Sequence, residues 1–134
     1  MMESRIKKLE QILKNDRFAN YNEIRLVSIG KGEARAELTV SENHLNGVDI
    51  IQGGALFTLA DFAFAAASNS HGRIAVASHA SISFFKVVSS GVLTAVAREI
   101  NSGKTLGTYE VDILDETGSK IAHFTGTAFL KGEY

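Results

Sequence analysis

The sequence predicts an α+β fold in which a strongly curved antiparallel sheet wraps around one long buried helix. Residues 53–69 are apolar on all sides, which is typical of a helix buried all round rather than of a surface helix. Six segments with strand character flank this helix, two before it and four after it. Helix and strands are segregated along the chain, which favours α+β over alternating α/β. The length of 134 residues fits one domain, 1–134.

Three elements are expected before the long helix. A short N-terminal helix is indicated by apolar residues with helical spacing, namely Ile6, Leu9, Ile12 and Leu13. Residues 22–29 have strand character, and residues 33–40 alternate apolar with polar side chains, as in a strand with one face in water. Residues 41–51 then form a loop that contains the turn dipeptide Asn46-Gly47.

Four strands are expected after the long helix, at residues 74–86, 92–100, 105–114 and 121–130. Short linkers with glycine join them, so they should form an antiparallel meander. In the first of these strands, one face should carry Ile74, Val76, Ser78, Ala80, Ile82 and Phe84. One sheet face cannot cover a helix that is apolar all round. We therefore expect a curved sheet and a partner subunit to cover it together.

Composition excludes several classes of function. The net charge of −1 provides no general attraction for nucleic acid or for an anionic membrane. We find neither an apolar run of transmembrane length nor the continuous apolar segment of a secretory signal. Cysteine is absent, which rules out disulfides and thiolate chemistry. A cytoplasmic location is expected, although a lack of cysteine fits any compartment.

Asp61 is the only formally charged side chain between Asp49 and Arg73, and it lies in the middle of the apolar helix. Burying an isolated carboxylate costs several kcal/mol or raises its pKa. Two interpretations follow for this residue. Its carboxylate forms a structural hydrogen bond with a buried backbone group or a partner chain, or its perturbed ionisation serves chemistry.

The junction between the loop and the helix holds further candidates. Gly53 and Gly54 open the helix, where free N–H groups and the helix dipole favour a developing negative charge. Asp61 follows Gly53 by eight residues, about 12 Å along the axis. That distance suits a site in which Asp61 of one chain faces Gly53 of a second, antiparallel helix. Each residue also has a structural interpretation: close packing for the glycines, a turn for Asn46 and a helix cap for Gln52.

The sequence resembles the hotdog-fold acyl-CoA thioesterases, in particular the phenylacetate-degradation (PaaI-type) branch. The matching segments are Leu45-Asn46-Gly47, Gln52-Gly53-Gly54 with the helix as far as Ala65, Asn69-Ser70, and Ala75-Val76-Ala77-Ser78. The spacing is fairly specific, because an amide residue is followed seven residues later by a glycine and after eight more by an acid. The resemblance extends over nearly the whole chain.

The resemblance implies a function and a role for each residue. The function is hydrolysis of a small, medium-chain or aryl-acetyl acyl-CoA to the free acid and coenzyme A. Asp61 would be the general base or the nucleophile, the Gly53 N–H would bind the oxyanion, and Asn46 would orient the carbonyl or the water. The implied substrate-binding residues are Gln52, Gly54, and Ser78 or Ser81. No metal and no cofactor are implied, and such proteins usually form dimers, often paired into tetramers with shared sites.

One departure from the family pattern leaves alternatives open. The family commonly has His-Gly-Gly where this chain has Gln52-Gly53-Gly54, and glutamine cannot carry a proton. A non-catalytic protein that binds acyl-CoA or another small ligand is therefore the second hypothesis. A dehydratase of the same fold is a third, but it would need a histidine at position 52.

Other residues carry weaker expectations. None of His44, His71, His79 and His123 has metal-ligand spacing with nearby acids, so a surface or strand position is expected for each. Possible contacts for the phosphates of coenzyme A are Lys86, Arg98 and Lys104. Candidate walls of the acyl pocket, some of which must belong to the core, are Phe57, Phe62, Phe64, Phe84 and Phe85.

Overall fold

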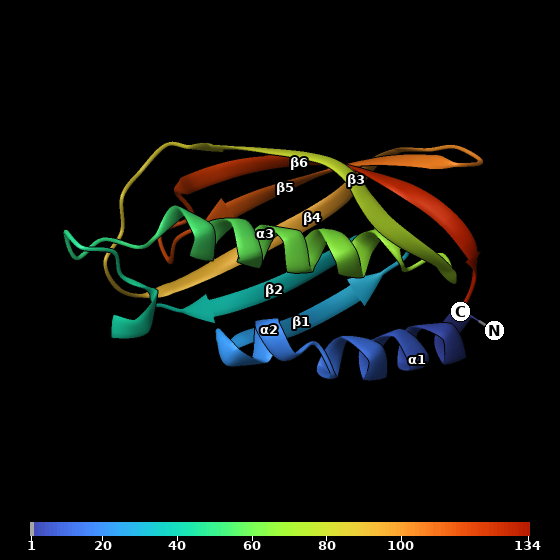
Figure 1. Cartoon of the computed structure of the whole chain (residues 1–134), viewed down its shortest axis with the longest axis horizontal. Coiled ribbons are helices and arrows are strands. Elements are labelled where there is room, and N and C mark those ends of the chain that lie inside the picture. The colour runs from blue at the N-terminus through green and yellow to red at the C-terminus, as the bar shows by residue number, and fades with distance from the viewer. Residues whose placement is uncertain (1) are drawn as a thin grey trace.

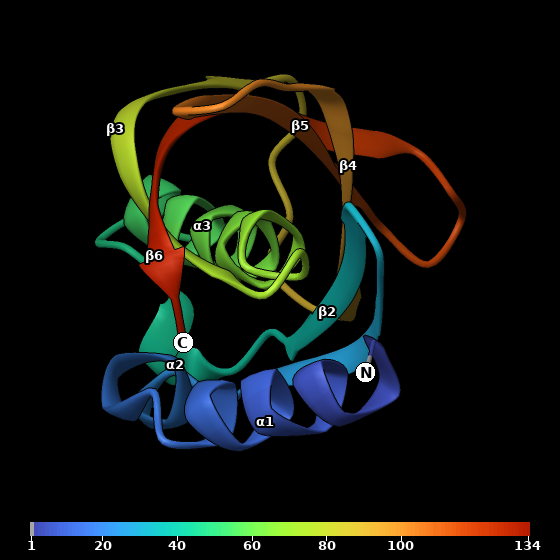
Figure 2. The same cartoon turned by 90° about the vertical axis from the view of Figure 1, so that its right-hand side faces the viewer.

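Six strands form one antiparallel sheet that curves around the long helix α3 (Figures 1 and 2). The computed structural model describes residues 2–134. Along the chain, the elements are α1 (Met2–Lys14), α2 (Arg17–Tyr21), β1 (Ile24–Gly30), β2 (Glu33–Thr39), a short 3₁₀ helix (Glu42–His44), α3 (Gly53–Ser68), β3 (Arg73–Phe84), β4 (Val92–Ser102), β5 (Leu106–Leu114) and β6 (Lys120–Glu133). The predicted α+β class, the curved sheet and the short N-terminal helix are all confirmed.

The strand order β1-β2-β4-β5-β6-β3 corrects the predicted meander. Strands β4, β5 and β6 do form a meander, but β3 pairs with β6 at the edge of the sheet and is not a neighbour of β4 in the strand order. Residues 85–91 do not make a hairpin: they pass around the N-terminal end of α3 (Figure 1). The carbonyl of Val88 in this connection accepts the N–H of Ile51 at 2.8 Å. The connection therefore braces the loop that precedes α3.

A β-bulge at Ser78 corrects the predicted face of β3. Ala77 pairs with Ala128 and His79 with Thr127, which leaves Ser78 as the extra residue. The bulge reverses the alternation. Ala80 and Ile82 pack against the core as expected, whereas Ile74 and Val76 face outward and are 41% and 43% exposed.

Helix α3 lies inside the curve of the sheet, and Figure 2 shows it nearly end-on. Its buried residues are Leu56, Leu59, Ala60, Phe62, Ala63, Phe64, Ala66, Ala67 and Ser68. The opposite strip of the helix is less covered, and it includes Gly54, Thr58, Asp61 and Ala65. Within one chain, therefore, the apolar helix keeps one open side. No helix among residues 2–134 has both the length and the apolar character needed to cross a membrane.

Gly126 on β6 lets α3 lie deep in the sheet. A Cβ atom at this position would come within 2.9 Å of the ring of Phe64, which projects from α3. The Phe64 ring also packs against Tyr109 and Phe124, with centroids 5.7 and 5.5 Å apart. A side chain at position 126 would push the ring, and with it the helix, away from the sheet.

Candidate active site

The loop between β2 and α3 is held rigidly around Asn46. The Asn46 side-chain oxygen accepts the N–H groups of Val48 at 3.0 Å and Ile50 at 3.3 Å. The main-chain N–H of Asn46 donates to the carbonyl of Ile50 at 2.8 Å. The structural role of Asn46 in the turn and its expected role in orienting the substrate are therefore compatible. Its oxygen makes the turn, while its NH₂ group has no hydrogen-bond acceptor within residues 2–134 and remains available to a ligand.

His44 anchors the same loop, which differs from the expected surface or strand histidine. The side chain is only 3% exposed. Its Nδ1 accepts the N–H of Ser41 at 2.9 Å, so its Nε2 carries the proton and donates to the carbonyl of Asn22 at 2.8 Å. The carbonyl of His44 in turn accepts the N–H of Gln52 at 2.8 Å. A neutral imidazole therefore ties the start of α3 to the chain before β1.

Asn46 and Gly53 line one hollow of about 200 Å³ at the N-terminus of α3. Phe84 and Lys86 also line it, and the Phe84 ring lies so close to Gly53 that a Cβ there would be 3.1 Å from it. Of the phenylalanines expected to form walls of the acyl pocket, Phe84 lines this hollow, whereas Phe62 and Phe64 belong to the core. A side chain at position 53 would therefore crowd the Phe84 ring at the start of α3.

Gln52 caps the N–H that a substrate oxyanion would need. Its side-chain oxygen Oε1 accepts the N–H of Gly53 at 3.1 Å. The amide is exposed, so it can turn away when another acceptor arrives. The structural interpretation of Gln52 as a helix cap is thus observed, and this cap occupies the candidate oxyanion position.

Asp61 lies apart from that hollow, halfway along the open strip of α3. It lines a second hollow, of about 180 Å³, together with Asp16, Phe18 and Thr58. Burial, and after it the negative charge of Asp16, raises the pKa of the Asp61 carboxyl above its ordinary value. One chain thus brings Asn46 and Gly53 together but not Asp61.

The two candidate serines lie on β3, away from both hollows. Ser81 pairs with Thr125 through their hydroxyl groups at 2.9 Å. This pair is on the convex face of the sheet, because the neighbouring Ala80 and Ile82 point to the core. Ser78 is the bulge residue, and its hydroxyl donates to the carbonyl of Thr127 at 3.2 Å. Within one chain, neither hydroxyl reaches Asp61.

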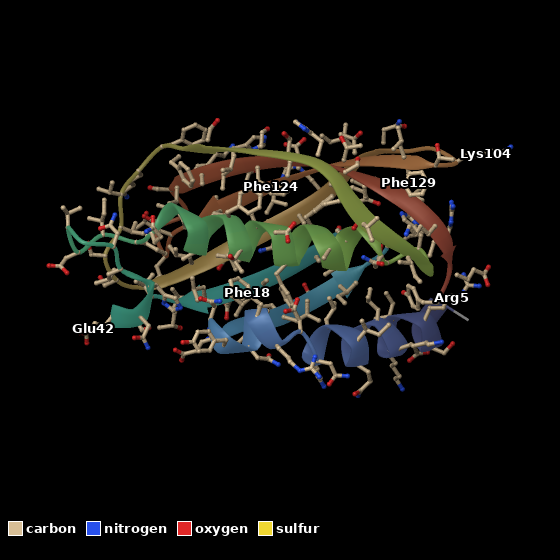
Figure 3. All side chains as sticks on the ribbon, in the orientation of Figure 1. Arg5, Phe18, Glu42, Lys104, Phe124 and Phe129 are labelled. Carbon is tan, nitrogen blue, oxygen red and sulfur yellow. The ribbon has the colours of Figure 1, made fainter. Side chains whose placement is uncertain are left out.

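Of the three candidate cations, only Lys86 borders the Asn46 hollow. Its Nζ pairs with Asp115 at 2.9 Å. Hydrogen bonds from Thr117 and then from Lys86 hold the pKa of Asp115 well below its usual range. Arg98 is bound to Glu110 and Asp112 on the outside of the sheet. Lys104 lies at the opposite end of the molecule from Glu42 and the candidate loop (Figure 3).

One group of side chains has the composition of a metal site, contrary to the expectation from sequence spacing. Ligand atoms of Glu110, Asp112 and His123 lie within 4.8 Å of one another. Arg98 and Lys120 already pair with this group at 2.6–3.2 Å. Although burial opposes the change, hydrogen bonds from His123, Arg98 and Lys120 lower the pKa of Asp112 to about 2. The group is thus a charge-balanced network on the outer sheet face.

The curved sheet around α3, with an amide and a helix N-terminus in one hollow, agrees with the comparison to known families. Residues 49–122 match the family model described as the Thioesterase superfamily. The chain belongs to the thioesterase superfamily. This membership confirms the resemblance, the hotdog fold and the class of thioester hydrolases.

Individual relatives agree with this membership. The chain is 40% identical over 113 residues to the acyl-coenzyme A thioesterase PaaI of Escherichia coli K12, an alignment that covers 84% of this chain and 81% of that protein. The solved E. coli PaaI structure superposes with a TM-score of 0.93 at 33% identity, covering 99% of this chain and 98% of the other. A Streptococcus mutans UA159 protein bound to acetyl CoA has a TM-score of 0.79 at 28% identity and covers 82% and 90% of the two chains.

Sequence reasoning missed two residues beside Asp61, namely Asp16 and Phe18. They belong to the start of α2, about one third of the chain away from Asp61. Asp16 did carry a local signal, because aspartate is a preferred residue at helix N-caps. Nothing local indicated that this cap would face the long helix.

Proposed function

We propose that the protein hydrolyses an acyl-CoA thioester to the free acid and coenzyme A, at sites shared between two copies. The observation that carries the proposal is that one chain holds two complementary sets of groups in separate hollows. One hollow holds the donors Asn46 and Gly53, and the open strip of α3 holds the carboxylate Asp61. Two antiparallel α3 helices would bring Asp61 of one chain to Gly53 of the other.

The chemistry follows from these groups. Asp61 takes a proton from water while the water oxygen attacks the thioester carbon, or its carboxylate attacks that carbon itself. Either route needs the ionised carboxylate. The carbonyl oxygen becomes negative and is held by the Gly53 N–H at the positive end of α3. The Asn46 NH₂ group orients the carbonyl. When water is the nucleophile, the C–S bond then breaks and the CoA sulfur takes the proton that Asp61 removed. When Asp61 attacks, breaking the C–S bond leaves an anhydride on Asp61 and a CoA thiolate; water then cleaves the anhydride to the free acid and supplies the proton for the thiolate. No step requires a metal ion or a cofactor.

Lys86 is the proposed contact for the phosphates of coenzyme A. It borders the hollow that would receive the thioester, whereas Arg98 and Lys104 do not. Asp115 holds it in place at 2.9 Å and would share it with an incoming phosphate. The S. mutans protein with acetyl CoA supports a coenzyme A ligand for this fold.

The decisive experiment measures release of free coenzyme A from acetyl-, octanoyl- and phenylacetyl-CoA. Asp61→Asn should reduce kcat by at least about 10²-fold, the low end for loss of a general base. The control Glu10→Gln makes the same change in net charge on α1 and should keep full activity. Retained turnover in Asp61→Asn would exclude the assigned role of Asp61.

A non-catalytic binding protein is the second candidate, and the capped Gly53 N–H favours it. Acyl-CoA binding by the parent protein without any turnover would establish this alternative.

A further inference from the structure

Two carboxyl groups, and no basic side chain, line the hollow at the middle of α3. Its walls are Asp16, Phe18, Ala19, Thr58, Asp61, Phe62 and Ala65. Asp16 comes from the start of α2, and Asp61 comes from the open strip of α3. The fold needs a helix cap at position 16, which a neutral Asn or Ser would also provide, and the proposed hydrolysis needs no second acid, so the negative charge of Asp16 calls for an explanation.

Asp16 is fixed in this position by its own helix. Its side-chain oxygen Oδ1 accepts the N–H of Ala19 at 2.9 Å, which makes it the N-cap of α2. Ala19 is 2% exposed and anchors α2 to the core. The carboxylate of Asp16 therefore cannot swing away from the hollow without giving up this cap.

The surroundings of Asp61 do nothing to offset the charge of Asp16. Helix α3 has no other charged residue, and the Thr58 hydroxyl donates to the carbonyl of Gly54 at 2.8 Å. Arg17 on α2 is exposed and does not line the hollow. Lys14 and Arg25 line a separate hollow near β1, and Phe62 belongs to both. Within residues 2–134, the Asp61 carboxylate has no hydrogen-bond donor.

We propose that Asp16 is a positioning residue for hydrolysis: its fixed negative charge, facing Asp61 across the hollow, makes the Asp61 carboxylate a stronger base. A neighbouring like charge disfavours ionisation, so the carboxylate binds a proton more tightly. The same effect raises its power to remove a proton from water, because base strength and proton affinity rise together. The direction of the pKa shift of Asp61 agrees with this geometry. The inference rests on the proposed function, since it concerns the strength of the base in that reaction.

The test is Asp16→Asn, which removes the charge and keeps a good helix cap. The acid limb of the kcat/KM–pH profile should move to lower pH, because Asp61 then ionises more easily. At the pH optimum, kcat should fall by less than about tenfold, since the base is weakened but not removed. Glu10→Gln is the matched control for net charge and should leave the acid limb where it is in the parent. Asp16→Ser, a second neutral cap, should repeat the shift if Asn is poorly tolerated.

A second measurement does not depend on turnover. The Asp61 carboxyl can be titrated by ¹³C NMR in the parent and in Asp16→Asn, and its midpoint should be lower in the variant. An unchanged midpoint together with an unchanged acid limb would overturn the role of Asp16 while leaving the hydrolysis proposal intact. A shifted midpoint in a protein without turnover would confirm the charge coupling and refute the proposed function instead.

Discussion

Gln52→Ala tests whether the cap on Gly53 restrains the reaction. In the structure, the Gln52 side chain accepts the N–H that would bind the oxyanion, at 3.1 Å. A substrate must displace this hydrogen bond, whose net worth is about 0.5–1.5 kcal/mol. Removing the competing acceptor should therefore raise kcat/KM by about 2- to 13-fold. The gain should be accompanied by a slightly lower melting temperature, because a helix cap contributes up to about 1 kcal/mol.

The assay is coenzyme A release at low substrate concentration, with thermal unfolding of the same samples. Gln11→Ala makes the same substitution on exposed α1 and serves as the control for both readouts. Gln52→Glu gives the opposite change, since a carboxylate at the positive end of α3 would cap more strongly and repel an oxyanion. The expected order of kcat/KM is thus Ala above Gln above Glu. A lower kcat/KM for Gln52→Ala would refute this reasoning, because the glutamine would then assist the carbonyl rather than compete with it.

Three further predictions concern stability, substrate affinity and assembly. The raised pKa of Asp61 means that its carboxyl stabilises the fold at acid pH and loses this contribution as pH rises through the folded-state pKa. Asp61→Asn should therefore melt no lower than the parent at pH 7, and a clearly lower melting temperature would support a structural carboxylate. Lys86→Gln should raise KM for acyl-CoA with little change in kcat, and should not affect a short thioester that lacks phosphates; an equal loss with both substrates would exclude a phosphate contact. Light scattering at micromolar concentration should show a dimer or a tetramer, and an active monomer would contradict the shared site.

The sequence predicted α1, α3 and the six strands, because their signals are local, but it did not predict the short α2. The uniform apolar run gave α3, and alternation gave the strands to within a few residues. The position of β3 could not be predicted in the same way. The rule that short linkers make hairpins favoured a β3–β4 pair, whereas the chain crosses the end of α3 to reach β4. The bulge at Ser78 could not be predicted either, because one extra residue in a strand does not change its composition.

The same difference between local signals and the three-dimensional arrangement applies to the candidate site. Asn46, Gly53 and Asp61 were found because their spacing resembles a family pattern. Asp16 and the capped state of the Gly53 N–H depend on how α2 and one side chain are placed in space. Charges that act on one residue from a distant part of the chain cannot be read from the residues next to it.

The absence of a side chain at Gly126 has a consequence for the proposed pair of chains. It sets how far α3 stands out from the concave side of the sheet, through the ring of Phe64. If two copies meet through their α3 helices, an outward shift of the helix occurs in both, and the space between the helices narrows by twice that shift. A methyl group inside each protomer would thus change the distance between Asp61 of one chain and Gly53 of the other without touching either residue. The width of the proposed shared site therefore depends on the far side of the helix, on a buried glycine that packs against Phe64.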